Sequence, residues 1–347
     1  MRVTIGDQRV GDGEPCFIIA EAGVNHNGDP ALARDLIDAA SGAGADAIKF
    51  QTFHAGDIAI PSADKAEYQE ACGAGESQAE MLARLELPDN ALGDLSGYAR
   101  GRGLVFLSSP FDRQSVDLLQ GLGVPAFKVA SGELTNTPLL RYIAGKGRPV
   151  LLSTGMATLE EIGEAVREIR AAGVSEILLL HCVTRYPAPL EAINLRVITT
   201  LRASFRLPVG FSDHTRGWAA PVAAVAVGGC VLEKHLTLDR ALPGPDHASS
   251  LEPGEFGEMV GLVRGVEAGL GTGVKEISAE EAEIRKAARR SLVSTVDIPE
   301  GAVIREGMVA PKRPGTGIPP RHLDGIIGRR ARVAIPRHTL LTWDMFA

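Results

Sequence analysis

The stretch VGFSDHTRGWAAPVAAVAVGGCVLEKHLTL, residues 209–238, contains two short apolar runs that both end in polar side chains. The first run, 209–215, carries His214 near its end, and the second, 230–238, carries His235. Apolar runs of this length are typical of parallel strands that are buried on both faces. The recurrence of this unit along the chain decides the fold.

Six further runs share the pattern, because each starts apolar and ends polar. They are 17–23, 46–53, 104–111, 126–133, 149–156 and 176–183. Stretches of helical periodicity lie between the runs, for example 30–44, 158–173 and 252–271, and several end in glycine. Eight strands alternating with helices over about 250 residues predict a (β/α)8 TIM barrel. An open doubly wound sheet is the alternative, but such sheets usually have fewer strands.

The composition indicates a globular enzyme or binding protein that takes neither nucleic acid nor membranes as a partner. The formal net charge of −7 and the aromatic content of 5% disfavour binding to polyanions and base stacking. The longest uncharged run, 217–232, is too short to span a bilayer. GxGxxG and GxxxxGK[ST] motifs are absent, which argues against the usual nucleotide sites. The four cysteines form no CxxC pair and the first residues lack a signal-peptide core, so we expect a cytoplasmic protein.

The last part of the chain has a different charge and pattern. Residues 285–347 contain 12 Lys and Arg against 5 Asp and Glu. We expect short strands there, separated by Gly- and Pro-rich turns, at 291–298, 331–335 and 338–343. The predicted organisation is a catalytic barrel at 1–271, a linker at 272–288 and a small β-rich domain at 289–347.

His214 and His235 end neighbouring strands of the predicted barrel. Adjacent strands lie about 4.8 Å apart, so two imidazoles at their ends can share one metal ion. Two histidines leave coordination positions open for water and substrate oxygens, which suits Mn²⁺ or Mg²⁺ acting on a carbonyl group. The alternative is that both are structural histidines held by hydrogen bonds.

Lys49 and Lys128 end two other strands, among several serines, and predict a site for a phosphate or carboxylate. Ion pairs with Glu21 or Glu133 are a second possibility that is compatible with the first. A Schiff-base lysine of a metal-free aldolase is a rival chemistry. Lys234 is a poor candidate for it, because strand alternation turns this side chain towards the helices.

Three further segments outside the strands are candidates for the site. Asp246 lies in a Pro- and Gly-rich turn and could bind substrate hydroxyls, although a helix-entry turn capped by Asp246 or Ser250 is equally compatible. The connection 54–88 is longer than usual and is expected to form a lid or binding loop. Arg313, in KRPGTG at 312–317, could either meet an anionic pocket or belong to a solvated basic face.

Taken together, the motifs resemble the sialic acid synthase family, whose members include the synthases of N-acetylneuraminate, legionaminate and pseudaminate. The matching barrel motifs are AEAGVNHNGD, IKFQTF, FKVASGE, LLSTGM, HCVTRYPAP, GFSDHT, LEKHLTLDRALPGPDH and SLEP. The C-terminal part, with SLV, IPEG, KRPGTG and IGR, is similar to the antifreeze-like (SAF) module of the family.

The resemblance implies a metal-dependent condensation of phosphoenolpyruvate with the open-chain aldehyde of a 2-acetamido-mannose-type sugar. Water enters, phosphate leaves by C–O cleavage, and a nine-carbon 2-keto acid results. The family's metal ligands correspond to His214 and His235. Its phosphoenolpyruvate contacts correspond to Lys49, Ser109, Lys128, Ser131, Ser153 and Ser212. Its sugar contacts correspond to Gln51, Tyr186 and Asp246, and its active-site acids to Glu21, Glu133 and Glu233.

The resemblance also implies a homodimer in which the C-terminal module is swapped, so that Arg313 reaches the partner's sugar pocket. The first expectation for the substrate is N-acetylmannosamine, giving N-acetylneuraminate. Thr184, near both substrates, stands where bacterial N-acetylneuraminate enzymes often carry Asn, so a 2,4-diacetamido-2,4,6-trideoxymannose, giving N,N'-diacetyllegionaminate, is the alternative. A pseudaminate synthase, a Schiff-base aldolase and a non-enzymatic carbohydrate-binding protein are less favoured.

Overall fold

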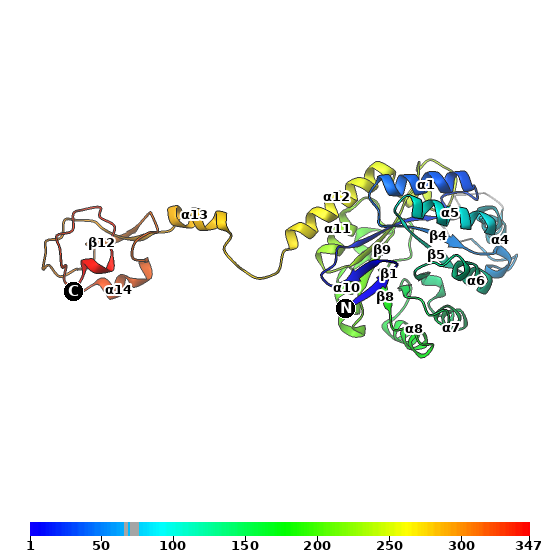
Figure 1. Ribbon diagram of the computed structural model, residues 1–347, viewed down its shortest axis with the longest axis horizontal. Coiled ribbons are helices and arrows are strands. Elements are labelled where there is room, and N and C mark those ends of the chain that lie inside the picture. Colours follow the sequence, from blue (N-terminus) through cyan, green and yellow to red (C-terminus); the bar gives the residue numbers. More distant parts are fainter. Residues whose placement is uncertain (66–68, 70–75) are drawn as a thin grey trace. The chain divides into compact units, whose positions relative to one another are not determined.

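The structure, a computed structural model, describes residues 1–65, 69 and 76–347 (Figure 1). It divides into two compact units, Met1–Gly271 and Thr272–Ala347, each with its own hydrophobic core. Within the described part of the chain, no helix combines the length and the apolar character needed to cross a membrane.

The first unit is built on eight parallel strands in one sheet, in the order β5-β4-β3-β10-β9-β8-β7-β6. The two strands at the ends of this order, β5 and β6, lie side by side, so the sheet is nearly closed. The predicted barrel is therefore confirmed. The strands are β3 (Phe17–Gly23), β4 (Ala47–Thr52), β5 (Val105–Pro110), β6 (Phe127–Val129), β7 (Val150–Ser153), β8 (Ile177–Cys182), β9 (Val209–Asp213) and β10 (Val231–His235).

Helices follow most of these strands and cover the outside of the barrel (Figure 1). Their starts are set by side-chain caps, such as Asp29 before α1 and the Thr158–Glu161 capping box of α8. The helices are α1 (Pro30–Gly42), α2 (Ala55–Ile58), α4 (Gln78–Leu85), α5 (Asp89–Gly101), α6 (Arg113–Gly121), α7 (Thr137–Ala144), α8 (Leu159–Ala171), α9 (Leu190–Ile193), α10 (Arg196–Phe205), α11 (Ala219–Ala226) and α12 (Pro253–Leu270).

Side chains alternate along each strand between the barrel interior and the helix layer. On β3, for example, Ile19 belongs to the small interior cluster, whereas Ile18 and Ala20 belong to the large cluster under the helices. The interior cluster fills the amino end of the barrel and includes Val3 and Ile5 of the N-terminal hairpin, β1 (Arg2–Ile5) and β2 (Gln8–Gly11). The interior at the carboxyl ends of the strands, called the mouth below, is left to the polar residues.

The second unit begins with α13 (Ala279–Ala288), a helix within the expected linker 272–288 whose residues are exposed or half-buried. Its sheet pairs β11 (Ser291–Ser294) with β12 (Val309–Lys312) in antiparallel fashion, and a short α14 (Leu323–Ile326) follows. The prediction of strands at 331–335 and 338–343 is wrong. Those segments form only isolated bridges, Ile298 with Ile335 and Val293 with Leu340, because irregular turns interrupt the ladder.

Candidate active site

The strand ends at the mouth surround a cavity of about 420 Å³. Most residues predicted for the site lie in its wall, and they come from all eight strands or the short segments after them. The predicted residues that line the cavity are Glu21, Lys49, Gln51, Ser109, Lys128, Ser131, Ser153, Thr184, Tyr186, Ser212, His214, Glu233 and His235.

Lys49 on β4 and Glu21 on β3 form a buried ion pair in this cavity. Lys49 Nζ lies 2.6 Å from Glu21 Oε2 and donates to Ser109 Oγ at 3.1 Å. Burial alone would lower the pKa of Lys49, but the carboxylates of Glu21 and Glu233 raise it above its ordinary value. Burial raises the pKa of Glu21 to about 7, against the effect of Lys49. Lys49 is therefore held as a cation beside a carboxyl group that titrates near neutral pH.

Lys128 on β6 and Glu233 on β10 form a second pair, with 3.3 Å between Lys128 Nζ and Glu233 Oε1. The same oxygen accepts a hydrogen bond from Ser212 Oγ at 2.8 Å. Burial lowers the pKa of Lys128, and Glu233 offsets this only in part. Glu233 Oε2 and Ser153 Oγ are buried and have no hydrogen-bond partner among the described residues. Two lysines and free hydroxyl groups around one cavity can hold a phosphate or a carboxylate.

His214 and His235 lie next to each other, with their ring centroids 5.5 Å apart. His214 Nδ1 lies 2.8 Å from the carbonyl oxygen of Val183, which can only accept, so Nδ1 carries the proton and Nε2 keeps its lone pair. His235 Nδ1 is buried and lacks a hydrogen-bond partner within the described ranges. Burial lowers the pKa of His235 well below its ordinary value, which favours the neutral form that binds metals. Burial also lowers the pKa of His214, but Cys182 and the carbonyl oxygen of Val183 raise it above its ordinary value. These donors fit a divalent metal ion.

Tyr186 covers the two histidines from the direction of β8. Its ring centroid lies 4.0 Å from that of His214 and 5.8 Å from that of His235. Tyr186 thus lines the same cavity as the histidine pair and packs against both rings.

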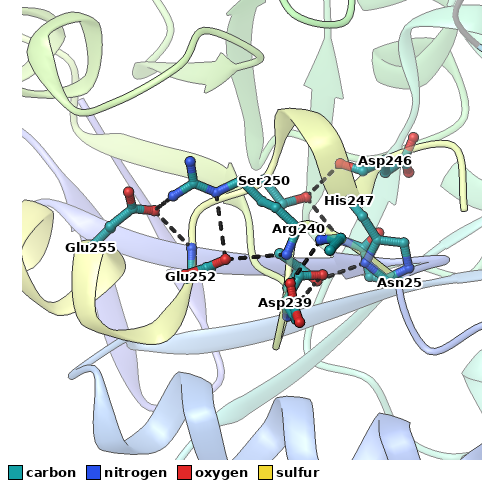
Figure 2. Close-up of polar contacts among 10 residues, drawn as sticks. Asn25, Asp239, Arg240, Asp246, His247, Ser250, Glu252 and Glu255 are labelled. Carbon is teal, nitrogen blue, oxygen red and sulfur yellow. Dashed lines mark hydrogen bonds and ion pairs between the residues drawn. The ribbon is translucent and has the colours of Figure 1, made fainter. Parts of the chain in front are cut away.

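Asp246 is not among the residues that line the cavity, but its carboxylate lies beside His235. Asp246 Oδ2 is 3.9 Å from His235 Nδ1, and burial raises the pKa of Asp246 to about 6. Ser250 Oγ donates to the carbonyl oxygen of Asp246 at 2.7 Å and accepts from Asn25 Nδ2 at 2.8 Å (Figure 2). These bonds fasten the turn to the segment after β3, which fixes the position of Asp246.

The same turn is tied to α12. Arg240 forms ion pairs with Glu252 and Glu255, and the backbone N–H of Glu252 donates to Glu255 Oε2 at 3.0 Å (Figure 2). Glu252 is the N-cap of α12, in a capping box with Glu255. The expectation that Asp246 or Ser250 caps this helix is therefore wrong, and Asp246 is left for another role.

Gly155, which follows β7, allows three side chains of the mouth to approach closely. Its backbone N–H donates to Ser131 Oγ at 3.0 Å. A Cβ atom at this position would overlap Thr184 Oγ1 and lie 2.8 Å from Ser131 Oγ and 3.2 Å from Cys182 Sγ. Cys182, which our sequence analysis did not select, lines the cavity 3.9 Å from His214 Nδ1.

Glu133, like Asp246, is not among the residues that line the cavity. Glu133 accepts a hydrogen bond from Asn136 Nδ2 at 2.7 Å, next to the start of α7. Arg313 belongs to the second unit, where its Nε donates to the carbonyl oxygen of Ala288 at 2.9 Å.

Lys234 points into the helix layer, as strand alternation predicts. Its Nζ lies 2.5 Å from Asp213 Oδ2 and also donates to the carbonyl oxygen of Thr215. Burial lowers the pKa of Lys234, and Asp213 opposes this effect. This pair fastens β10 to β9 behind the two histidines.

The cavity also has apolar residues that the sequence analysis missed, namely Phe53, Ile58, Leu82, Phe111 and Met156. Three of them lie within or directly before the connection 54–88, which was expected to be a lid or binding loop. The unusual length of this connection was the sequence signal that could have pointed to these apolar residues. Residues 66–68 and 70–75 of this connection lie outside the described residues.

A second group of possible metal ligands comprises His54, Asp57 and Asp112. Its central carboxylate is already used, since Asp112 Oδ2 accepts from the His54 N–H at 3.0 Å and from Ser115 Oγ at 2.7 Å. Asp112 also raises the pKa of His54 against the effect of burial. We interpret this group as a structural tie between the loops after β4 and β5.

Comparison with known proteins agrees with this geometry. The chain matches the NeuB family over residues 36–275 and the SAF domain over residues 289–347. It is 44% identical over 339 residues to the N,N'-diacetyllegionaminic acid synthase of Legionella pneumophila, covering 96% of this chain and 95% of that protein. It is 37% identical over 328 residues to the N-acetylneuraminate-9-phosphate synthase of Homo sapiens, covering 94% and 91%.

Among solved structures, the N-acetylneuraminic acid synthetase of Leptospira borgpetersenii, crystallised with citrate, superimposes with a TM-score of 0.73 at 35% identity. The match covers 82% of this chain and 95% of that chain. The predicted resemblance is thus confirmed, as is the prediction of a phosphoenolpyruvate-dependent enzyme that forms a carbon–carbon bond. The chain belongs to the NeuB family and carries a C-terminal SAF domain.

Proposed function

We propose that this chain condenses phosphoenolpyruvate with 2,4-diacetamido-2,4,6-trideoxymannose and water, giving N,N'-diacetyllegionaminate and phosphate. The observation that carries the proposal is its greater identity to a legionaminic acid synthase than to the human N-acetylneuraminate-9-phosphate synthase, over nearly the same length. This reverses the order of the two sugars expected from sequence. Thr184, at the rim of the cavity beside Gly155, supports the change because it replaces a larger amide side chain.

Phosphoenolpyruvate would lie between the two ion pairs. Lys49 and Lys128 supply positive charge, and Ser109, Ser153 and Ser212 supply hydroxyl donors around the same cavity. The incoming anion competes with Glu21 and Glu233 for the lysines, so the pairs hold both ammonium groups in place before the substrate arrives. Ser131 Oγ, which accepts from the Gly155 N–H, lies at the rim of the same cavity.

The sugar aldehyde would lie at the histidine pair. His214 and His235 would hold Mn²⁺ or Mg²⁺, which when bound polarises a carbonyl oxygen. Gln51, Tyr186 and Asp246 would bind the acylamino and hydroxyl groups of the sugar, and Tyr186 packs against the rings of both histidines.

In the reaction, C3 of phosphoenolpyruvate bonds to C1 of the aldehyde, water adds to C2, and phosphate leaves with the former enol oxygen. The new hydroxyl group at C1 needs a proton, and the added water must lose one. Glu21 pairs with Lys49 and also comes near His235, because a Cβ at Gly23 would lie 3.3 Å from both Glu21 Oε1 and His235 Cε1. We assign Glu21 to this proton transfer and Glu233 to holding Lys128. We assign no proton to Glu133, which bonds Asn136 instead.

The C-terminal unit would complete the site in a homodimer. Family resemblance suggests that Arg313 of one copy reaches the sugar pocket of its partner. The charge distribution supports this, because the acidic chain of net charge −7 has an excess of Lys and Arg in residues 285–347. Arg313→Ala should then raise the KM for the sugar without changing the mass of the oligomer in light scattering.

N-acetylneuraminate synthesis from N-acetylmannosamine is the second candidate, supported by the superposition on the Leptospira borgpetersenii enzyme. The two are separated by measuring phosphate release with phosphoenolpyruvate, Mn²⁺ and each sugar in turn. We expect kcat/KM to be higher with the trideoxy sugar. A preference for N-acetylmannosamine would overturn the first assignment in favour of the second.

A further inference from the structure

The cavity wall directly after β4 and β5 is apolar, beyond the polar residues Lys49 and Ser109 of the same two strands. Phe53, Ile58, Leu82 and Phe111 line the cavity there. These four belong to a hydrophobic cluster that is separate from the barrel cores. Within it the rings of Phe53 and Phe111 pack edge to face, with centroids 6.1 Å apart. The apolar wall formed by these four residues is thus fixed by packing.

The apolar wall faces the histidine pair across the barrel. Phe53 follows β4 and Phe111 follows β5, whereas His214 follows β9. In the closed strand order, β5 lies opposite β9 and β4 lies opposite β8. An open-chain sugar whose aldehyde lies at His214 can extend its far carbons across the mouth to the apolar wall, beyond the phosphoenolpyruvate site at Lys49 and Ser109.

The two candidate sugars differ at those far carbons. N-acetylmannosamine carries hydroxyl groups at C4 and C6, whereas the trideoxy sugar carries an acetamido group at C4 and a methyl group at C6. Hydroxyl groups against Ile58 and Leu82 would lose water without gaining a hydrogen bond from these side chains, which is unfavourable. Methyl groups would instead gain from burial.

We infer that the apolar wall is a subsite for the C6 methyl and the C4 acetamido methyl, and that it selects 6-deoxy sugars; this assignment rests on the proposed function. Gln78, which lies between Ile58 and Leu82 in the sequence, also lines the cavity. Its side chain donates to Gln69 Oε1 at 3.3 Å. The amide group of Gln78 therefore lines the same cavity as the apolar side chains, where it can form a hydrogen bond with the polar part of an acetamido group.

The test uses three sugars that change one group at a time: N-acetylmannosamine, 2-acetamido-2,6-dideoxymannose and 2,4-diacetamido-2,4,6-trideoxymannose. An added or removed methyl-sized group in an apolar pocket changes kcat/KM by about tenfold or more. We expect the wild-type chain to gain about tenfold in kcat/KM at each step of the series.

Two matched pairs of variants then probe the wall. Ile58→Thr and Ile58→Val have the same shape and differ by one hydroxyl group. Leu82→Asn and Leu82→Met compare a polar with an apolar replacement. We expect the selectivity for the 6-deoxy sugars to fall about tenfold in Ile58→Thr and Leu82→Asn, and to stay within about threefold of wild type in the apolar controls.

Equal selectivity within each pair would overturn the subsite, even if the wild-type chain prefers the trideoxy sugar as proposed. A wild-type preference for N-acetylmannosamine would overturn the proposed function and the subsite together. Thermal unfolding of each variant identifies misfolding. The near-isosteric Met156→Gln, at a cavity residue outside the wall that is 71% exposed, is a further control and should keep the selectivity within about threefold of wild type.

Discussion

Lys49 Nζ lies 2.6 Å from Glu21 Oε2, and both side chains are only 3% exposed. A buried ion pair of this kind is weak evidence for stability, because removal of two charges from water costs about as much as their attraction returns. Its position in the mouth, beside Ser109, instead points to a lysine that is held ready for an anionic substrate.

Lys49→Met should lower kcat/KM for phosphoenolpyruvate by at least about a hundredfold, since a positioned charge is lost from the site. It should also lower the free energy of unfolding by about 3–5 kcal/mol, because Glu21 is left buried without its partner. The double variant Lys49→Met/Glu21→Gln should recover most of the stability and none of the activity. Urea unfolding and phosphate release measure the two effects, and recovery of activity in the double variant would contradict the assigned role.

Mn²⁺ binding should depend on His235 and not on His54. His235→Gln removes a donor of the proposed pair, so the affinity for Mn²⁺ measured by calorimetry should fall about a hundredfold or more. His54→Gln is the control from the second group of possible ligands, His54, Asp57 and Asp112. The assignment of the metal would move to that group if His54→Gln weakened binding and His235→Gln did not.

Lys234 should matter for stability and not form a Schiff base. Its Nζ is occupied by Asp213 and Thr215 in the helix layer, so borohydride with pyruvate should leave the chain unmodified by mass spectrometry. Lys234→Met should lower the free energy of unfolding by about 3–5 kcal/mol, because it leaves the buried Asp213 carboxylate without its cation. Covalent trapping on any lysine would favour a Schiff-base aldolase instead.

Gly155→Ala should damage the site by sterics alone. The added Cβ overlaps Thr184 Oγ1, so we expect a loss of about 1–3 kcal/mol in stability and a higher KM for the sugar. Gly97→Ala is the matched control, because a Cβ at this position on α5 has nothing within 4 Å. It should stabilise the chain by about 0.5–1 kcal/mol. Equal effects of the two substitutions would refute the close approach at Gly155.

His26 and His247 should make the chain less stable at acid pH. Burial lowers the pKa of each ring to about 4, below the ordinary value of 6.5. Between these pH values each of these two rings binds more protons in the unfolded chain than in the folded chain, so their contribution to folding stability decreases as the pH falls from about 6.5 to 4. Glu21 and Asp246, whose pKa values burial raises, contribute with the opposite sign, so urea midpoints across this range are to be compared between wild type and a histidine variant. His247→Asn should reduce the slope, and an unchanged slope would show that His247 contributes nothing.

The strand ends were predictable because the alternation along a buried strand assigns each side chain to one layer. This rule placed Lys49 and His235 in the mouth and Lys234 in the helix layer from sequence alone. The N-terminal hairpin was missed, although Val3 and Ile5 alternate with polar residues before a Gly-Asp turn. The strand pattern at 331–335 was misleading, because local β propensity does not ensure a neighbouring strand.

The apolar wall could not be predicted in the same way. Ile58 and Leu82 lie on short helices in a long connection, and their meeting with Phe111 depends on tertiary packing. The short distance between Asp246 and His235 likewise depends on the hydrogen bond that Asn25 Nδ2 donates to Ser250 Oγ, because this bond joins segments far apart in the chain.

The central claim is that the mouth joins phosphoenolpyruvate to an acylated mannose-type aldehyde with the help of a divalent metal. The most direct measurement is phosphate release from phosphoenolpyruvate labelled with ¹⁸O at the bridging oxygen, with the trideoxy sugar, before and after removal of metal by chelation. We predict labelled phosphate that requires the sugar, is lost on chelation and returns with Mn²⁺. Release of unlabelled phosphate, or full activity after chelation, would contradict the account.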